Sequence, residues 1–187
     1  AAPCSPLSLP RDAVARIRAV VSKAPSMKIR ISIPRQTLEL CSSDGQVLQC
    51  WPVSTAGKGA GEVSGSYCTP RGEHVVRAKI GAGQAENTVF VGRRPTGECY
   101  SADLEAANPG RDWILTRILW LSGCEPGRNR LGNVDTMRRY IYIHGSPDSA
   151  RMGEPGSHGC IRMRNADIVE LFDRVSVGTT VTISESD

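Results

Sequence analysis

The stretch YIYIHGSPDSARMGEPGSHGCIRMR, residues 140–164, places two of the chain's three histidines and an isolated cysteine around a Gly/Pro-rich connection. The apolar alternation at its start predicts a strand that ends at His144. A turn is predicted at SHGC, residues 157–160, because Gly159 lets the backbone bend sharply. Three chemistries use a cysteine near histidines: a thiol nucleophile, a metal site and one half of a disulfide.

The bulk composition predicts one globular domain. A chain of 187 residues that is 40% hydrophobic is long enough for one buried core. We expect an N-terminal extension over residues 1–27, a single domain over residues 28–187, and a monomer. The net charge of +4 comes from dispersed residues and argues against a nucleic acid partner. No membrane span is expected, because the most apolar run, residues 113–121, contains Arg117.

The seven cysteines bear on the cellular compartment. They include no CxxC pair, which favours disulfides over zinc and hence an exported protein in an oxidising space. The pairing stays open from sequence, although hairpin geometry favours Cys41 with Cys50. An odd number leaves at least one thiol unpaired, and Cys160 stands apart from the other six. Those six are Cys4, Cys41, Cys50, Cys68, Cys99 and Cys124.

Alternating hydrophobic residues predict a mainly β class. Strands are expected at residues 29–33, 37–40, 47–54, 75–76, 88–91, 113–121, 140–144 and 179–183, with a turn at residues 44–45. Pro52 predicts a sheet edge or a strand end. A short amphipathic helix is expected at residues 12–23, and another begins at Asn165 as its N-cap. Residues 92–112 are predicted to be a long connection.

The chemistry of residues 140–164 centres on Cys160. A thiol becomes a nucleophile when a base, a cation or a helix N-terminus favours the thiolate. His144, at a strand end, is placed to face Cys160 across the intervening loop. Backbone N–H groups near Gly159 fit an oxyanion hole, and Arg162 fits a substrate carboxylate or the oxyanion. We expect His74 to cap a strand edge by hydrogen bonding or to face water.

Residues 142–145 (YIHG) and 157–162 (SHGCIR) resemble the active-site motif of the L,D-transpeptidases, the YkuD-type cysteine enzymes that modify peptidoglycan. Residues 51–55 (WPVST) and 69–72 (TPRG) resemble further segments of that domain, and the likeness covers residues 28–183. The resemblance implies an L,D-transpeptidase-like β-sandwich or open barrel with one or two short helices packed on it. The other cysteines and a long insert at residues 81–112 depart from a minimal domain of this kind.

The resemblance also assigns roles by position. It makes Cys160 the acyl-accepting thiol and His144 its base, with no metal or organic cofactor. The remaining site residues orient this pair, hold the oxyanion or contact substrate: Ser157, His158, Gly159, Gly145 through its carbonyl, and Arg162.

The implied reaction is acyl transfer from the tetrapeptide stem of peptidoglycan, with release of D-alanine. The acceptor amine belongs to a second stem, giving a 3-3 cross-link, or to a lysine of an outer-membrane lipoprotein. Carboxypeptidase activity and D-amino acid exchange are alternatives at the same site. The resemblance further implies acylation by carbapenem-type β-lactams and a location in the periplasm or cell envelope.

Two rival hypotheses remain from the residues alone. In the first, His144, His158 and Cys160 bind zinc and leave one coordination position open. In the second, Cys160 forms a disulfide within an exported, non-catalytic domain that binds the cell wall. Metal analysis tests the first hypothesis, and a count of free thiols tests the second.

Overall fold

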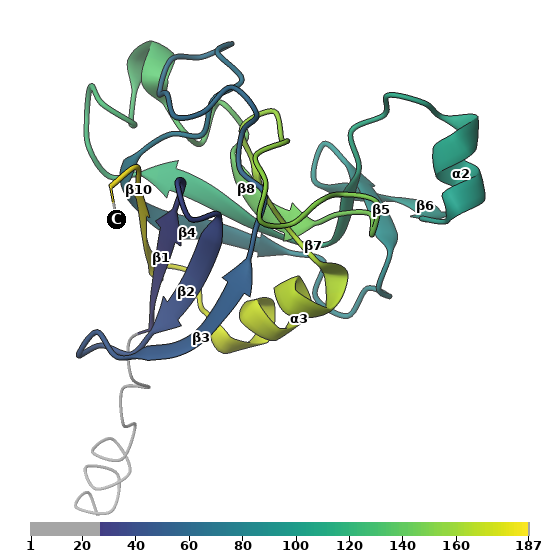
Figure 1. The fold of residues 1–187 in the computed structure, drawn as a ribbon, viewed down its shortest axis with the longest axis horizontal. Coiled ribbons are helices and arrows are strands. Elements are labelled where there is room, and N and C mark those ends of the chain that lie inside the picture. Colours follow the sequence, from purple (N-terminus) through teal and green to yellow (C-terminus); the bar gives the residue numbers. More distant parts are fainter. Residues whose placement is uncertain (1–26, 187) are drawn as a thin grey trace, which may run out of the picture.

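A computed structural model describes residues 27–186. The fold is mainly β: ten strands form one sheet, and two α-helices and one short 3-10 helix complete this part of the chain (Figure 1). The strands are β1 (Lys28–Ser32), β2 (Thr37–Cys41), β3 (Val47–Pro52), β4 (Gly72–Ile80), β5 (Thr88–Val91), β6 (Arg94–Cys99), β7 (Ile114–Gly123), β8 (Tyr142–Gly145), β9 (Ile161–Met163) and β10 (Thr180–Ser184). The helices are α2 (Ala102–Ala107), α3 (Asn165–Arg174) and the 3-10 helix η1 (Gly132–Val134).

The sheet is open. Its order is β3-β2-β1-β10-β4-β7-β5-β6, and β8 and β9 branch from β7. Most neighbours are antiparallel, but β1 pairs with β10, and β8 with β9, in parallel. β3 is the edge strand and ends at Pro52, as the proline predicted. The expected mainly β class with an unclosed sheet is therefore confirmed.

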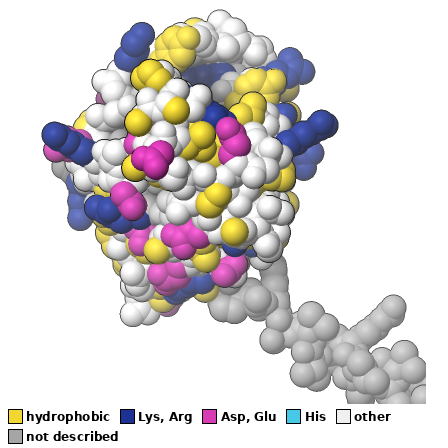
Figure 2. Space-filling model, turned by 90° about the vertical axis from the view of Figure 1, so that its right-hand side faces the viewer, with side chains coloured by type: hydrophobic (Ala, Val, Ile, Leu, Met, Phe, Trp, Pro, Cys, Tyr) yellow, Lys and Arg dark blue, Asp and Glu magenta, His cyan; other side chains and the backbone are white. Residues whose placement is uncertain are grey.

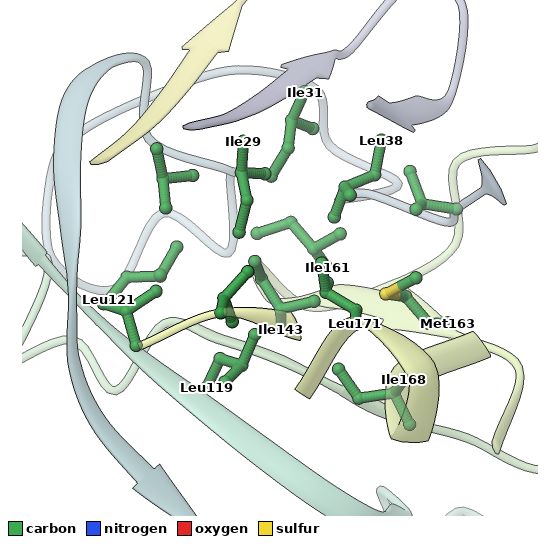
Figure 3. Packing of buried hydrophobic residues seen from close by; sticks show 14 of the residues in the cluster. Ile29, Ile31, Leu38, Leu119, Leu121, Ile143, Ile161, Met163, Ile168 and Leu171 are labelled. Carbon is green, nitrogen blue, oxygen red and sulfur yellow. The ribbon is translucent and has the colours of Figure 1, made fainter. Parts of the chain in front are cut away.

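The core forms between the β1–β2–β10 part of the sheet and the β7–β8–β9 part (Figure 3). β1 and β2 pair Ile29 with Leu40 and Ile31 with Leu38, so the period-two pattern puts these four side chains on one buried face. The apolar stripe of α3 packs against the opposite side of the cluster. Further buried residues include Leu119, Leu121, Ile143, Ile161, Ile168 and Leu171.

The prediction that residues 92–112 form a plain connection is wrong. They contain β6 and α2, which project from one side of the molecule (Figure 1). β6 lacks apolar alternation and is held by pairing with β5 across the two-residue turn Gly92–Arg93. α2 begins where the Ser101 side chain accepts a hydrogen bond from the Leu104 N–H. Backbone pairing and one cap, rather than hydrophobic pattern, therefore create both elements.

The surface over this projecting part is mixed in charge. Figure 2 shows acidic and basic side chains interspersed with hydrophobic ones on the side that carries α2 and β6. In residues 27–186 no helix is long and apolar enough to cross a membrane.

The expected capping role of Asn165 is wrong, although the helix itself is confirmed. Arg164 occupies the N-cap position, and Asn165 is the first residue of α3. The buried Asn165 side chain instead accepts a hydrogen bond from Thr116 Oγ1 at 2.7 Å and donates one to Asn87 Oδ1 at 2.8 Å. It therefore ties α3 to β7 and to the segment before β5.

The predicted Cys41–Cys50 disulfide is also wrong. In the β2–β3 pairing Cys41 lies opposite Val47, and Cys50 lies opposite Glu39. Cys41 is buried and Cys50 is exposed, and no disulfide joins the six cysteines of residues 27–186. The hairpin register pairs Leu40 with Gln49, so the two cysteines do not lie opposite each other. Three expectations fall on residues outside the described part of the chain: the helix at residues 12–23, Cys4, and the extension at residues 1–27 except for its last residue.

Replacing a central core residue should lower stability strongly. Leu119 on β7 is fully buried, so Leu119→Ala leaves a cavity and should reduce the free energy of unfolding by about 2–5 kcal/mol. Urea denaturation measures this change. Val177→Ala is the matched control, since Val177 is 60% exposed, and it should change the free energy by less than about 0.5 kcal/mol. Similar effects of the two substitutions would contradict this core assignment.

Candidate active site

The parallel pairing of β8 and β9 builds the site. Ile143 lies opposite Ile161 and His144 opposite Arg162, so the chain returns alongside β8 after the loop of residues 146–160. Cys160 precedes β9 and therefore lies beside Tyr142. The Tyr142 N–H donates to Cys160 Sγ at 3.4 Å, and the thiol donates to the Tyr140 carbonyl at 3.4 Å.

Both residues of the expected catalytic pair line one pocket of about 460 Å³. Ser157, His158 and Arg162 line it too, so the structure brings five of the seven predicted site residues to one cavity. The remaining two, Gly145 and Gly159, lie directly beside His144 and Cys160 in the chain. Other lining residues, which sequence reasoning did not assign, are Gly92, Arg93, Asp112, Ile114, Arg139, Tyr140, Ile141 and Tyr142.

His144 is held in one tautomer by its backbone neighbour. Its Nδ1 lies 2.8 Å from the Gly145 carbonyl, which only accepts, so Nδ1 carries the proton and Nε2 keeps its lone pair. The side chain is 1% exposed, and burial lowers its pKa to about 4. The imidazole is therefore neutral at pH 7. In residues 27–186 no hydrogen bond joins this ring to Cys160.

Gly145 is required by its surroundings. A Cβ at this position would overlap Asn165 Oδ1 and lie 2.8 Å from the Leu115 carbonyl. Asn165, with its partner Thr116, therefore packs directly behind the carbonyl that orients His144. Sequence reasoning missed this supporting role of Asn165, since its position suggested a helix cap.

The Cys160 thiol is neutral at rest. Burial is the main cause that raises its pKa to about 12, and the charge of Asp112 acts in the same direction, whereas the Tyr142 N–H and the charges of Arg162 and Arg139 act to lower it. Burial outweighs these favourable contacts. The uncharged thiol is therefore the favoured form at pH 7.

The SHGC turn is fixed by three short contacts. The Ser157 hydroxyl donates to the Cys160 carbonyl at 2.5 Å, and the Gly159 N–H donates to Ser157 Oγ at 3.2 Å. Thr69 Oγ1 donates to the Gly159 carbonyl at 3.0 Å. Gly159 has φ of +127°, which L side chains rarely adopt. The Gly159 N–H is thus already engaged, and among the described contacts the Cys160 N–H of this turn has no acceptor.

The remaining predicted residues frame the pocket. Arg162 Nη2 contacts Asp112 Oδ1 at 2.7 Å, and its Nη1 donates to the Gly156 carbonyl at 3.1 Å. The exposed His158 ring packs edge-on against Tyr67, with ring centroids 5.9 Å apart. Arg162 therefore carries a charge that Asp112 already neutralises.

His74 lies outside this pocket. Its ring is fully buried, with Nδ1 2.9 Å from the Gly72 carbonyl and Nε2 3.2 Å from Thr136 Oγ1. The expected hydrogen bonding is present and the alternative of exposure is wrong. Within residues 27–186 no group of three or more His, Cys, Asp or Glu side chains is arranged to hold a metal ion.

Comparison with known proteins identifies the family. The model of the YkuD L,D-transpeptidase catalytic domain matches residues 26–183, and the chain belongs to this family. It is 36% identical to YkuD of Bacillus subtilis over 90 residues, which cover 48% of this chain and 44% of that protein. It is 49% identical to YbiS of Escherichia coli over 43 residues, which cover 23% of this chain and 14% of that protein. The matches thus span less than half of these curated relatives.

Solved structures support the same fold. The L,D-transpeptidase 3 of Mycobacterium tuberculosis, in complex with a faropenem-derived adduct, superposes with a TM-score of 0.53 at 19% identity. The alignment covers 86% of this chain and 61% of that one. A mutant of the Enterococcus faecium L,D-transpeptidase gives a TM-score of 0.51 at 18% identity over 85% of this chain and 50% of that one.

The two buried histidines should make stability depend on pH. Burial lowers the pKa of both His144 and His74 to about 4, whereas an unfolded histidine titrates near 6.5. Their contribution is complete above pH 6.5 and is lost as the pH falls towards 4, because the unfolded chain binds the protons first. As the pH falls from 6 to 4.5, protonation of each histidine in the unfolded chain should lower the free energy of unfolding by about 1.4 kcal/mol per pH unit.

Urea denaturation across this pH range measures the slope. His74→Gln should remove about half of the histidine contribution, while His158→Gln, at an exposed position, should keep the wild-type slope. A slope that His74→Gln leaves unchanged would contradict the burial of an uncharged imidazole at this position.

Proposed function

We propose that the chain is a peptidoglycan L,D-transpeptidase in which Cys160 is the nucleophile and His144 its base. The observation that carries the proposal is the parallel β8–β9 pairing, which places this thiol and this imidazole in one pocket of a family-matched domain. The neutral imidazole is a proton acceptor and the neutral thiol a proton donor, so the pair is in the protonation states that the first step needs.

The first half-reaction forms a thioester. His144 Nε2 takes the Cys160 proton as the sulfur attacks the carbonyl of the residue at position three of a tetrapeptide stem. The imidazolium is stabilised by its Nδ1–H bond to the Gly145 carbonyl. It then gives the proton to the departing nitrogen, and the bond to the terminal D-alanine breaks. We assign the developing oxyanion to the Cys160 N–H, because Ser157 already accepts from the Gly159 N–H.

The second half-reaction transfers the acyl group to an amine. His144 takes a proton from the amine as it attacks the thioester carbonyl. The carbon–sulfur bond then breaks, and His144 returns the proton to the sulfur, which restores the thiol. An amine of a second stem gives a 3-3 cross-link, and a lysine of an outer-membrane lipoprotein gives an anchored protein. Water or a D-amino acid gives carboxypeptidase or exchange activity at the same atoms. Since peptidoglycan lies outside the cytoplasm, we place the chain in the periplasm or cell envelope.

The remaining pocket residues position these groups. Ser157 fixes the turn that presents Cys160, and His158 lines the pocket and packs against Tyr67. Arg162 remains a proposed substrate contact, and a substrate carboxylate must compete with Asp112 for it. No metal or organic cofactor takes part in these steps.

The proposal predicts a covalent adduct on Cys160. Incubation with a carbapenem should add the mass of one inhibitor molecule, and incubation with a tetrapeptide muropeptide should release D-alanine. Mass spectrometry reads both outcomes, and Cys160→Ala should show neither. A wild-type protein that gains no adduct and leaves the muropeptide intact would instead support the alternative of a non-catalytic wall-binding domain.

A second prediction concerns the base. His144→Gln removes the proton acceptor but leaves Cys160 in place, so turnover of the muropeptide should fall by about 10²–10⁴-fold. The rate of D-alanine release measures this loss. His74→Gln is the matched control, because His74 is equally buried but lies outside the pocket, and its turnover should stay within a few-fold of wild type at pH 7.

A further inference from the structure

Arg93 lines the thiol pocket from the hairpin between β5 and β6. Gly92 and Arg93 form its two-residue turn, with φ values of +54° and +67°. Turns of this kind favour Asn and Gly, because a side chain such as that of arginine is strained at positive φ. A strained residue that lines a pocket is a candidate for function when its surroundings hold it in place.

Three aromatic side chains hold the Arg93 guanidinium. Its Cζ lies 4.4 Å from the centroid of the Trp120 ring and 4.9 Å from that of Tyr140. Its Nη1 donates to the Tyr142 hydroxyl at 2.9 Å. Tyr140 is itself strained, with φ of +57°, and Trp120 pairs with Tyr142 across β7 and β8. The charge is therefore fixed by stacking, which orients the planar group but does not neutralise it.

Arg93 differs in this respect from the other two arginines of the pocket. Arg162 is paired with Asp112, and Arg139 donates to the carbonyls of Gly61, Glu62 and Cys68. Within residues 27–186 Arg93 takes part in no ion pair, and its Nε and Nη2 groups have no protein acceptor. An oriented guanidinium with two free donor groups is a receptor for a carboxylate.

The position of Arg93 relative to the Cys160 sulfur indicates which carboxylate of a bound peptide Arg93 can reach. The Tyr142 backbone N–H contacts Cys160 Sγ, and the side-chain hydroxyl of the same residue contacts Arg93. The length of one tyrosine residue, together with these two contacts, therefore limits the distance between the guanidinium and the sulfur. One residue advances an extended peptide by about 3.3–3.6 Å, so a carboxylate one residue beyond the attacked carbonyl falls within this span.

We propose that Arg93 binds the C-terminal carboxylate of the donor peptide, on the residue that leaves when Cys160 is acylated. This assignment rests on the proposed function, since it presumes a peptide donor at Cys160. It makes the β5–β6 hairpin a specificity element that selects peptides ending one residue after the attacked carbonyl.

Equilibrium binding in the Cys160→Ala background tests the proposal without requiring chemistry. The probes are a muropeptide tetrapeptide with a free C-terminal carboxylate and the same peptide as its C-terminal carboxamide, each titrated by calorimetry. With Arg93 present, the acid should bind about tenfold more tightly than the amide, as for a charge-assisted hydrogen bond at a partly exposed site. Arg93→Gln should bring the ratio close to one, and Arg93→Lys should keep only part of it.

Arg94→Gln is the matched control, because Arg94 is the next residue, is exposed and does not line the pocket. It should keep the tenfold preference. Circular dichroism confirms that each variant is folded. Two results would overturn the Arg93 assignment: a preference for the acid that remains in Arg93→Gln, or no preference when Arg93 is present. Both results are compatible with muropeptide turnover by the wild-type chain. A chain that binds and cleaves neither peptide instead contradicts the proposed function itself.

Discussion

The parallel pairing between β8 and β9 is the constraint on which the site depends. Parallel strands need a crossover that leaves one end of the sheet and re-enters it at the opposite end, and residues 146–160 provide it. This return places the residue before β9 next to the start of β8, so a thiol and an imidazole 16 positions apart in the chain line one cavity. The buried Ile143–Ile161 pair holds this register, because a slip of β9 by one residue would remove Ile161 from the core and place Arg162 there.

Burial sets the resting chemistry of the pair. Desolvation favours the uncharged form of both groups, so the site holds a thiol and an imidazole instead of a thiolate and an imidazolium. The Gly145 carbonyl then decides which ring nitrogen is free, and Asn165 and Thr116 pack behind that carbonyl. Core packing around α3 and β7 is thereby linked to the tautomer of one histidine.

Much of this architecture could be predicted from sequence, because regular hydrophobic alternation and the HG and SHGC segments are local signals. The strands around Ile29, Ile31 and Leu119 follow directly from that alternation. The β6 strand and the α2 helix could not be predicted from hydrophobic pattern, since pairing with β5 and the Ser101 cap create them. The role of Asn165 could not be predicted because it depends on a distant residue, Thr116. Likewise Arg93 looked like one basic residue in a polar connection, and only the fold brings Trp120, Tyr140 and Tyr142 around it.

The uncharged state of the Cys160 sulfur has a consequence for its survival. Peroxides and disulfides react with the deprotonated form of cysteine and hardly with the protonated one. In the proposed reaction the sulfur gives up its proton only when a carbonyl compound is in the pocket, so its raised pKa slows oxidation between turnovers. The raised pKa that makes the Cys160 thiol a weak nucleophile at rest thus also lowers its rate of oxidation.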